Sequence, residues 1–63
     1  MRYMISNTTD KVRVGTVVEG STLLEIIAEV DKLFRMSFTI SLVRAGKIYI
    51  RNSHECVVLK KLN

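Results

Sequence analysis

The chain has 63 residues, a hydrophobic content of 48% and a net charge of +4, so residues 1–63 are expected to form one small domain. Because it has one cysteine and one histidine, the sequence excludes an intrachain disulfide and predicts neither a metal site nor a cofactor. No apolar run approaches the roughly 18 residues that span a bilayer, and the N-terminal residues lack the apolar core of a signal peptide. We therefore expect a cytoplasmic protein without a membrane partner.

Two strands are expected ahead of the first helical pattern. Residues 2–6 form a weak strand pattern. Residues 12–18, with the sequence VRVGTVV, are β-branched and alternate, which is typical of a strand. The polar segment NTTDK joins the two runs. We expect Val12 and Val14 to face the core, and Arg13 to face away from it.

The clearest pattern in the chain is an amphipathic helix that begins after Thr22. At 100° per residue, its six apolar side chains fall within an arc of about 120°. Thr22 is a favourable N-cap, and Glu25, three residues later, completes a capping box. The helix is expected to end near Arg35 or Met36. The apolar stripe consists of Leu23, Ile26, Ile27, Val30, Leu33 and Phe34.

Three further strands are expected over residues 38–43, 47–51 and 56–62. The first two form a hairpin whose turn, RAGK, contains Gly46, which can adopt the positive φ of a tight turn. The polar turn NSHE leads to the last strand. The inward-facing partners of the helix are then Ile40, Leu42, Ile48, Ile50, Val57 and Leu59.

The element order is therefore β-β-α-β-β-β. One amphipathic helix can cover one face of an antiparallel sheet, so the predicted fold class is a two-layer α+β domain. The segment VVEGSTLLEIIAEV, residues 17–30, resembles the loop and helix of small β-grasp proteins, including sulfur carriers. The resemblance implies a β-grasp-like topology as one option for the strand order. Sulfur carriers act through a C-terminal Gly-Gly tail, whereas this sequence ends KKLN, so their activity is not expected here.

The two-residue alternation of the predicted strands places basic side chains on the sheet face opposite the helix. Five of the ten basic residues lie in the last three strands and their turns, where Glu55 is the one acid. Cations, the hydroxyls of Thr39 and Ser41, and one aromatic ring suit a phosphate backbone with a stacked base. A solvated face that keeps the sheet soluble has the same composition. The candidate nucleic-acid-binding residues are Arg13, Arg44, Lys47, Tyr49, Arg51 and Lys60.

Apolar side chains outside the core favour a protein-contact role. Val43 and Val58 are expected on the open sheet face, and Leu24 and Ala28 on the helix flank. The sequence does not decide whether this contact surface is the sheet face, an edge strand or the helix flank. We favour a non-enzymatic regulator, inhibitor or adaptor that forms a homo-oligomer or docks on a protein partner, as phage and mobile-element products of this size often do. Nucleic-acid binding is the alternative.

Two short segments contain residue types that can take part in chemistry. In SHEC, residues 53–56, His54 and Cys56 can share a face, but Glu55 points to the other side and nothing orients the base. We expect a polar turn, a small buried thiol and no catalytic residue. The segment EGS, residues 19–21, lacks the glycine spacing of a phosphate loop and is expected to turn the chain from strand into helix.

Overall fold

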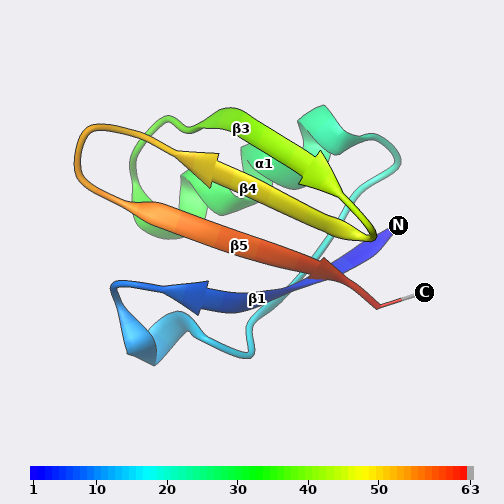
Figure 1. Cartoon of the computed structure of the whole chain (residues 1–63), viewed down its shortest axis with the longest axis horizontal. Coiled ribbons are helices and arrows are strands. Elements are labelled where there is room, and N and C mark those ends of the chain that lie inside the picture. The colour runs from blue at the N-terminus through cyan, green and yellow to red at the C-terminus, as the bar shows by residue number, and fades with distance from the viewer. Residues whose placement is uncertain (63) are drawn as a thin grey trace.

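The structure, a computed structural model, describes residues 1–62. In this part of the chain, five strands form one antiparallel sheet and one α-helix covers a face of it (Figure 1). The two-layer α+β class is therefore confirmed. In chain order the elements are β1 (Arg2–Thr8), the 3₁₀ helix η1 (Lys11–Arg13), β2 (Val17–Glu19), α1 (Leu23–Phe34), β3 (Thr39–Arg44), β4 (Lys47–Arg51) and β5 (Cys56–Lys61).

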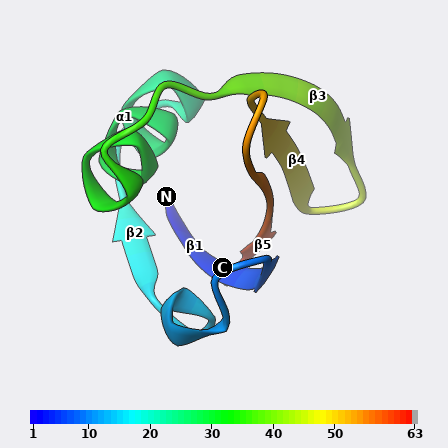
Figure 2. The ribbon, with the colours of Figure 1, turned by 90° about the vertical axis from the view of Figure 1, so that its left-hand side faces the viewer.

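The strands are arranged in the order β2-β1-β5-β4-β3, and every neighbouring pair is antiparallel. The first and last strands of the chain, β1 and β5, are thus neighbours inside the sheet. The sheet curves partway around the helix, with β2 beside α1 and β3 at the opposite edge (Figure 2). This curvature leaves one concave face for the core and one convex face for solvent.

The helix begins and ends as its sequence predicts. The Oγ1 of Thr22 accepts a hydrogen bond from the Glu25 backbone N–H at 3.2 Å. The Glu25 carboxylate returns to the chain one residue earlier than in a standard capping box, because it accepts the N–H of Ser21 at 2.6 Å. Gly20 allows this tight approach, since a Cβ there would lie 2.8 Å from the Cβ of Glu25. The last helical residue is Phe34, and Arg35 caps the helix at φ 55°.

The core joins the helix stripe to the inward residues of the sheet. Tyr3 and Ile5 of β1 are also buried, and the weak strand pattern of residues 2–6 did not single them out as core positions. Phe34 and Phe38 meet edge to face, with ring centroids 5.3 Å apart. The largest fully buried side chains are Ile5, Ile26, Val30, Ile48, Ile50, Val57 and Leu59.

The prediction of a strand over residues 12–18 is wrong for residues 12–16, because β2 begins only at Val17. The Oδ1 of Asp10 accepts the N–H of Val12 at 3.2 Å and caps η1, and Gly15, at φ 97°, then reverses the chain. Val12 is 91% exposed and Val14 is also exposed, so neither faces the core. A local side-chain cap has overridden the β-branched pattern, as Asp commonly does at turns.

A β-bulge in β3 makes the prediction wrong for Leu42 and Val43, and the edge position of β3 makes it wrong for the burial of Ile40. Ile40 pairs with Ile50, but the register then shifts, so Leu42 pairs with Tyr49. Since a one-residue shift moves side chains to the other face, Leu42 lies on the convex face rather than in the core, and Val43 turns to the concave side rather than the open face. Ile40 keeps its predicted direction but is exposed, because β3 is an edge strand.

The hairpin between β3 and β4 is confirmed, including the positive φ of Gly46 at 78°. Its other central residue, Ala45, also has a positive φ, of 48°. Two successive left-handed residues are typical of a type I′ turn, in which Asn-Gly is the preferred pair. An alanine in this conformation is disfavoured by the contact of its Cβ with the backbone.

The substitution Ala45→Asn should therefore stabilise the protein. Asn tolerates the left-handed region better than Ala, so the free energy of unfolding should rise by about 0.5–1 kcal/mol. Urea denaturation followed by circular dichroism measures the change. Ala45→Val, which adds a β-branched side chain at the same exposed position, should destabilise the protein. If Ala45→Asn lowered stability, the assignment of this turn would be wrong.

Candidate binding face of the sheet

The convex face of the sheet, opposite α1, is hereafter called the open face. Residues that pair across antiparallel strands point to the same side, so the register places their side chains in rows. Arg44 pairs with Lys47, and Lys47 pairs with Lys60 on the next strand. These three residues form the basic row. It crosses β3, β4 and β5 at one end of the hairpin.

A second row is apolar. Leu42 pairs with Tyr49, and Tyr49 pairs with Val58. Tyr49 and Val58 are half-buried, whereas Leu42 is 45% exposed. The bulge in β3 is responsible for this row, because it brings Leu42 onto the open face beside the tyrosine ring. The apolar row lies directly alongside the basic row.

Arg51 stands on the other side of the apolar row, where it pairs with Thr39 and Cys56. Lys47 and Arg51 each lie two residues from Tyr49 along β4, a separation of about 7 Å. The structure thus brings five of the predicted nucleic-acid-binding residues together on one surface. They are Arg44, Lys47, Tyr49, Arg51 and Lys60. Val58, a predicted protein-contact residue, lies on the same surface.

The basic row and Arg51 lack acidic partners. Within residues 1–62, the basic row and Arg51 have no carboxylate within 4.0 Å. The ion pairs of this part of the chain lie elsewhere and join Arg2 to Glu19, Arg13 to Asp10, and Lys32 to Glu29. Adjacent strands are only about 4.8 Å apart, so like charges in register repel each other and lower stability. An anion bound on this face would relieve that repulsion.

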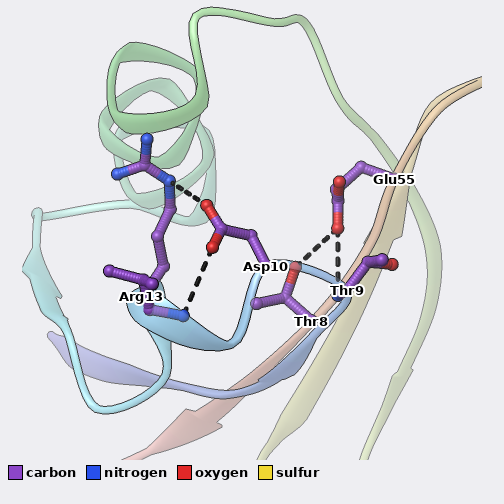
Figure 3. Close-up of polar contacts among 6 residues, drawn as sticks. Thr8, Thr9, Asp10, Arg13 and Glu55 are labelled. Carbon is purple, nitrogen blue, oxygen red and sulfur yellow. Dashed lines mark hydrogen bonds and ion pairs between the residues drawn. The ribbon is translucent and has the colours of Figure 1, made fainter.

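Arg13 does not belong to the open face (Figure 3). It lies on η1, where its Nε is 3.2 Å from Asp10 Oδ2, in an ion contact without the alignment of a hydrogen bond. Its guanidinium also lies over the Phe34 ring, 5.0 Å from the centroid. The prediction that Arg13 lies on the outward face of a strand is wrong, because residues 11–13 form a 3₁₀ helix.

The carboxylate of Glu55 ties the loop before β5 to the end of β1. Its Oε1 accepts the hydroxyl of Thr8 at 2.9 Å and the backbone N–H of Thr9 at 3.0 Å (Figure 3). The hydrogen bond from Thr8, supported by those from the backbone, lowers the pKa of Glu55 below its ordinary value, against the opposing effect of partial burial. Glu55 is therefore engaged in structure rather than in orienting His54.

Cys56 is exposed, so the prediction of a buried thiol is wrong. Val57 and Leu59 face the core, and the two-residue period of β5 then turns Cys56 to the open face. His54 is also exposed, and its backbone N–H donates to Asn52 Oδ1 at 2.7 Å. In the described chain, no group of three His, Cys, Asp or Glu side chains could hold a metal ion.

A hollow lies between β2 and α1, at the edge of the sheet opposite β3. It is an open groove of about 720 Å³. Its charged walls are already paired, because Arg2 contacts Glu19 at 3.2 Å and Lys32 contacts Glu29 at 2.9 Å.

Among the candidate contact residues on the helix flank, Leu24 is 77% exposed, and Ala28 is exposed as well. No helix of residues 1–62 has the length and hydropathy to cross a bilayer.

Comparison of the chain with protein-family models, curated proteins and solved structures finds no match. The likeness of residues 17–30 to β-grasp proteins therefore stays a prediction. Any function must be argued from the surfaces described above.

The lowered pKa of Glu55 predicts a pH-dependent contribution to stability. A carboxyl with a folded pKa below its unfolded value stabilises the fold above about pH 4.5, and this contribution is lost as pH falls through the folded pKa. Glu55→Gln should therefore be less stable than wild type at pH 7. Urea midpoints of the two proteins should converge as pH falls below 4.5. A difference that stayed constant from pH 7 to strongly acidic pH would contradict the assignment.

Charge reversal within the basic row should stabilise the protein. Lys47→Glu places a carboxylate between Arg44 and Lys60, so two repulsions become attractions and the free energy of unfolding should rise by about 0.5–1 kcal/mol. Thermal unfolding at low and high salt measures the effect, which should shrink as salt screens it. Lys47→Gln, which removes the charge without reversing it, should give an intermediate value. A destabilised Lys47→Glu variant would show that the row is not repulsive.

Proposed function

We propose that this protein is a non-enzymatic contact module, a regulator, inhibitor or adaptor that acts through protein–protein association. Its main contact surface is the free edge of β3, and its first partner is a second copy of the chain. The observation that carries this proposal is the exposure of β3: all six of its residues are exposed, in a strand that pairs with β4 on one side only.

The β3 edge has the composition of a pairing strand. Ile40, Leu42 and Val43 are 43%, 45% and 53% exposed, and Arg44 at the strand end is its single charge. Edge strands of monomers are commonly protected by lysines, prolines, bulges or covering elements. Here the bulge at Ser41 is the one such device. It shortens the regular ladder, which favours a weak contact over an extended one.

The opposite edge of the sheet is different. Strand β2 has only three residues and ends in Glu19, which pairs with Arg2, and α1 lies beside it (Figure 2). One edge is thus short and flanked by the helix, while the other is long and open. Pairing between identical edges closes after two copies, as in a two-fold symmetric dimer, and does not continue into a fibre.

A second copy fits the charge of β3. In an antiparallel arrangement the two Arg44 side chains lie at opposite ends of the shared ladder, so they do not repel each other. Backbone groups of each strand would be satisfied by the other, which is the mode of recognition known as β-augmentation. The free thiol of Cys56 is compatible with the reducing cytoplasm that we expect for this module.

Self-association should be visible in the mass of the purified protein. A six-residue edge buries less than a standard interface, so we expect dissociation on the order of 100 μM. In sedimentation equilibrium, the mass should rise with concentration from 7.2 kDa toward twice that value. Val43→Lys should keep the protein monomeric, because lysine on an edge strand opposes pairing.

Leu24→Lys provides the matched control, since it makes the same kind of change at an exposed site on the helix. It should associate like wild type, and circular dichroism should show that both variants are folded. A wild-type mass of 7.2 kDa at every concentration would refute self-association. Loss of association in Leu24→Lys alone would move the contact to the helix flank.

A further inference from the structure

We propose that the open face is a second binding site, separate from the β3 edge, and that its ligand is single-stranded nucleic acid. Phosphates would contact the basic row and Arg51, and a base would stack on Tyr49 between them. The inference stands on the monomer alone and does not depend on self-association.

The phosphate contacts follow from the arrangement of charge. Arg44, Lys47 and Lys60 are in register on three neighbouring strands, without carboxylates within 4.0 Å in residues 1–62. Their mutual repulsion lowers the stability of the folded protein, and a bound polyanion would relieve it. Each phosphate that these cations neutralise would also release counterions, which makes such binding favourable at low salt.

The base contact follows from the place of Tyr49. Its ring lies in the apolar row, between Leu42 and Val58, and is half-buried. The register places an apolar side chain on each side of Tyr49, and the partly exposed residue leaves surface open to a ligand. Lys47 and Arg51 lie two residues from Tyr49 in opposite directions along β4, a backbone separation of about 7 Å. The ring can therefore stack a base while the flanking phosphates contact these cations.

Single strands are favoured over the other polyanions by this ring. In a duplex the bases are stacked on one another and cannot reach a tyrosine on a convex face. An acidic peptide would satisfy the cations but has no flat group to place on Tyr49. The observations therefore favour a ligand with both phosphates and exposed bases, bound without strong dependence on sequence.

Fluorescence anisotropy with a labelled oligothymidylate of about 12 nucleotides tests the site. Binding should be detectable at about 50 mM salt, with a slope of log affinity against log salt of about −2 to −3 for three or four phosphate contacts. Tyr49→Ala should weaken binding about tenfold, and Tyr49→Phe, which keeps the ring, should stay within about twofold of wild type.

Lys47→Glu should weaken binding by about tenfold or more and flatten the salt slope. Lys32→Glu makes the same change of charge on α1 and should bind nearly like wild type. Circular dichroism of each variant separates loss of the site from loss of the fold.

Three results would overturn the proposal. The first is no binding at low salt. The second is equal competition by polyglutamate together with an unchanged Tyr49→Ala variant, which would assign the face to acidic protein segments. The third is equal loss in Lys47→Glu and Lys32→Glu, which would mean attraction to net charge without a site.

Discussion

The structure depends on the burial of one apolar stripe of α1 against the concave face of the sheet. Ile26 and Val30 are fully buried there, and each such side chain contributes about 1.5–3 kcal/mol when removed from water. Because Ile48 and Ile50 must face this stripe, the two-residue period of β4 forces its alternate side chains outward. The basic character of the open face is thus a geometric consequence of the core, combined with the choice of lysine and arginine at the outward positions.

Much of this arrangement could be predicted from the chain alone. The helix, the hairpin turn at Gly46 and the inward set of β4 and β5 follow from patterns that local structure and packing both support. The strand over residues 12–18 failed because Asp10 caps a 3₁₀ helix, an interaction that overrides β propensity. Cys56 was within reach of prediction, since placing Val57 inward already requires its neighbour to point outward.

The bulge at Ser41 could not be predicted in the same way. The run from Phe38 to Val43 is apolar at enough positions to fit either register, and only the pairing with β4 decides between them. Its effect on the surface is large, because it exchanges Leu42 for Val43 on the open face. Leu42 consequently borders both proposed surfaces, the β3 edge and the apolar row. In a dimer joined antiparallel through β3, the two open faces would lie on the same side of one continuous sheet.

The position of β5 has a consequence for biosynthesis. It separates the β1–β2 pair from the β3–β4 hairpin, and each half of the sheet reaches the other only through this strand. A nascent chain that has not yet released residues 56–61 from the ribosome therefore has a helix and two isolated strand pairs, which are marginal in water. The sheet can close only after residues 56–61 have left the ribosome, and its closure is expected to show the slower kinetics of long-range pairing.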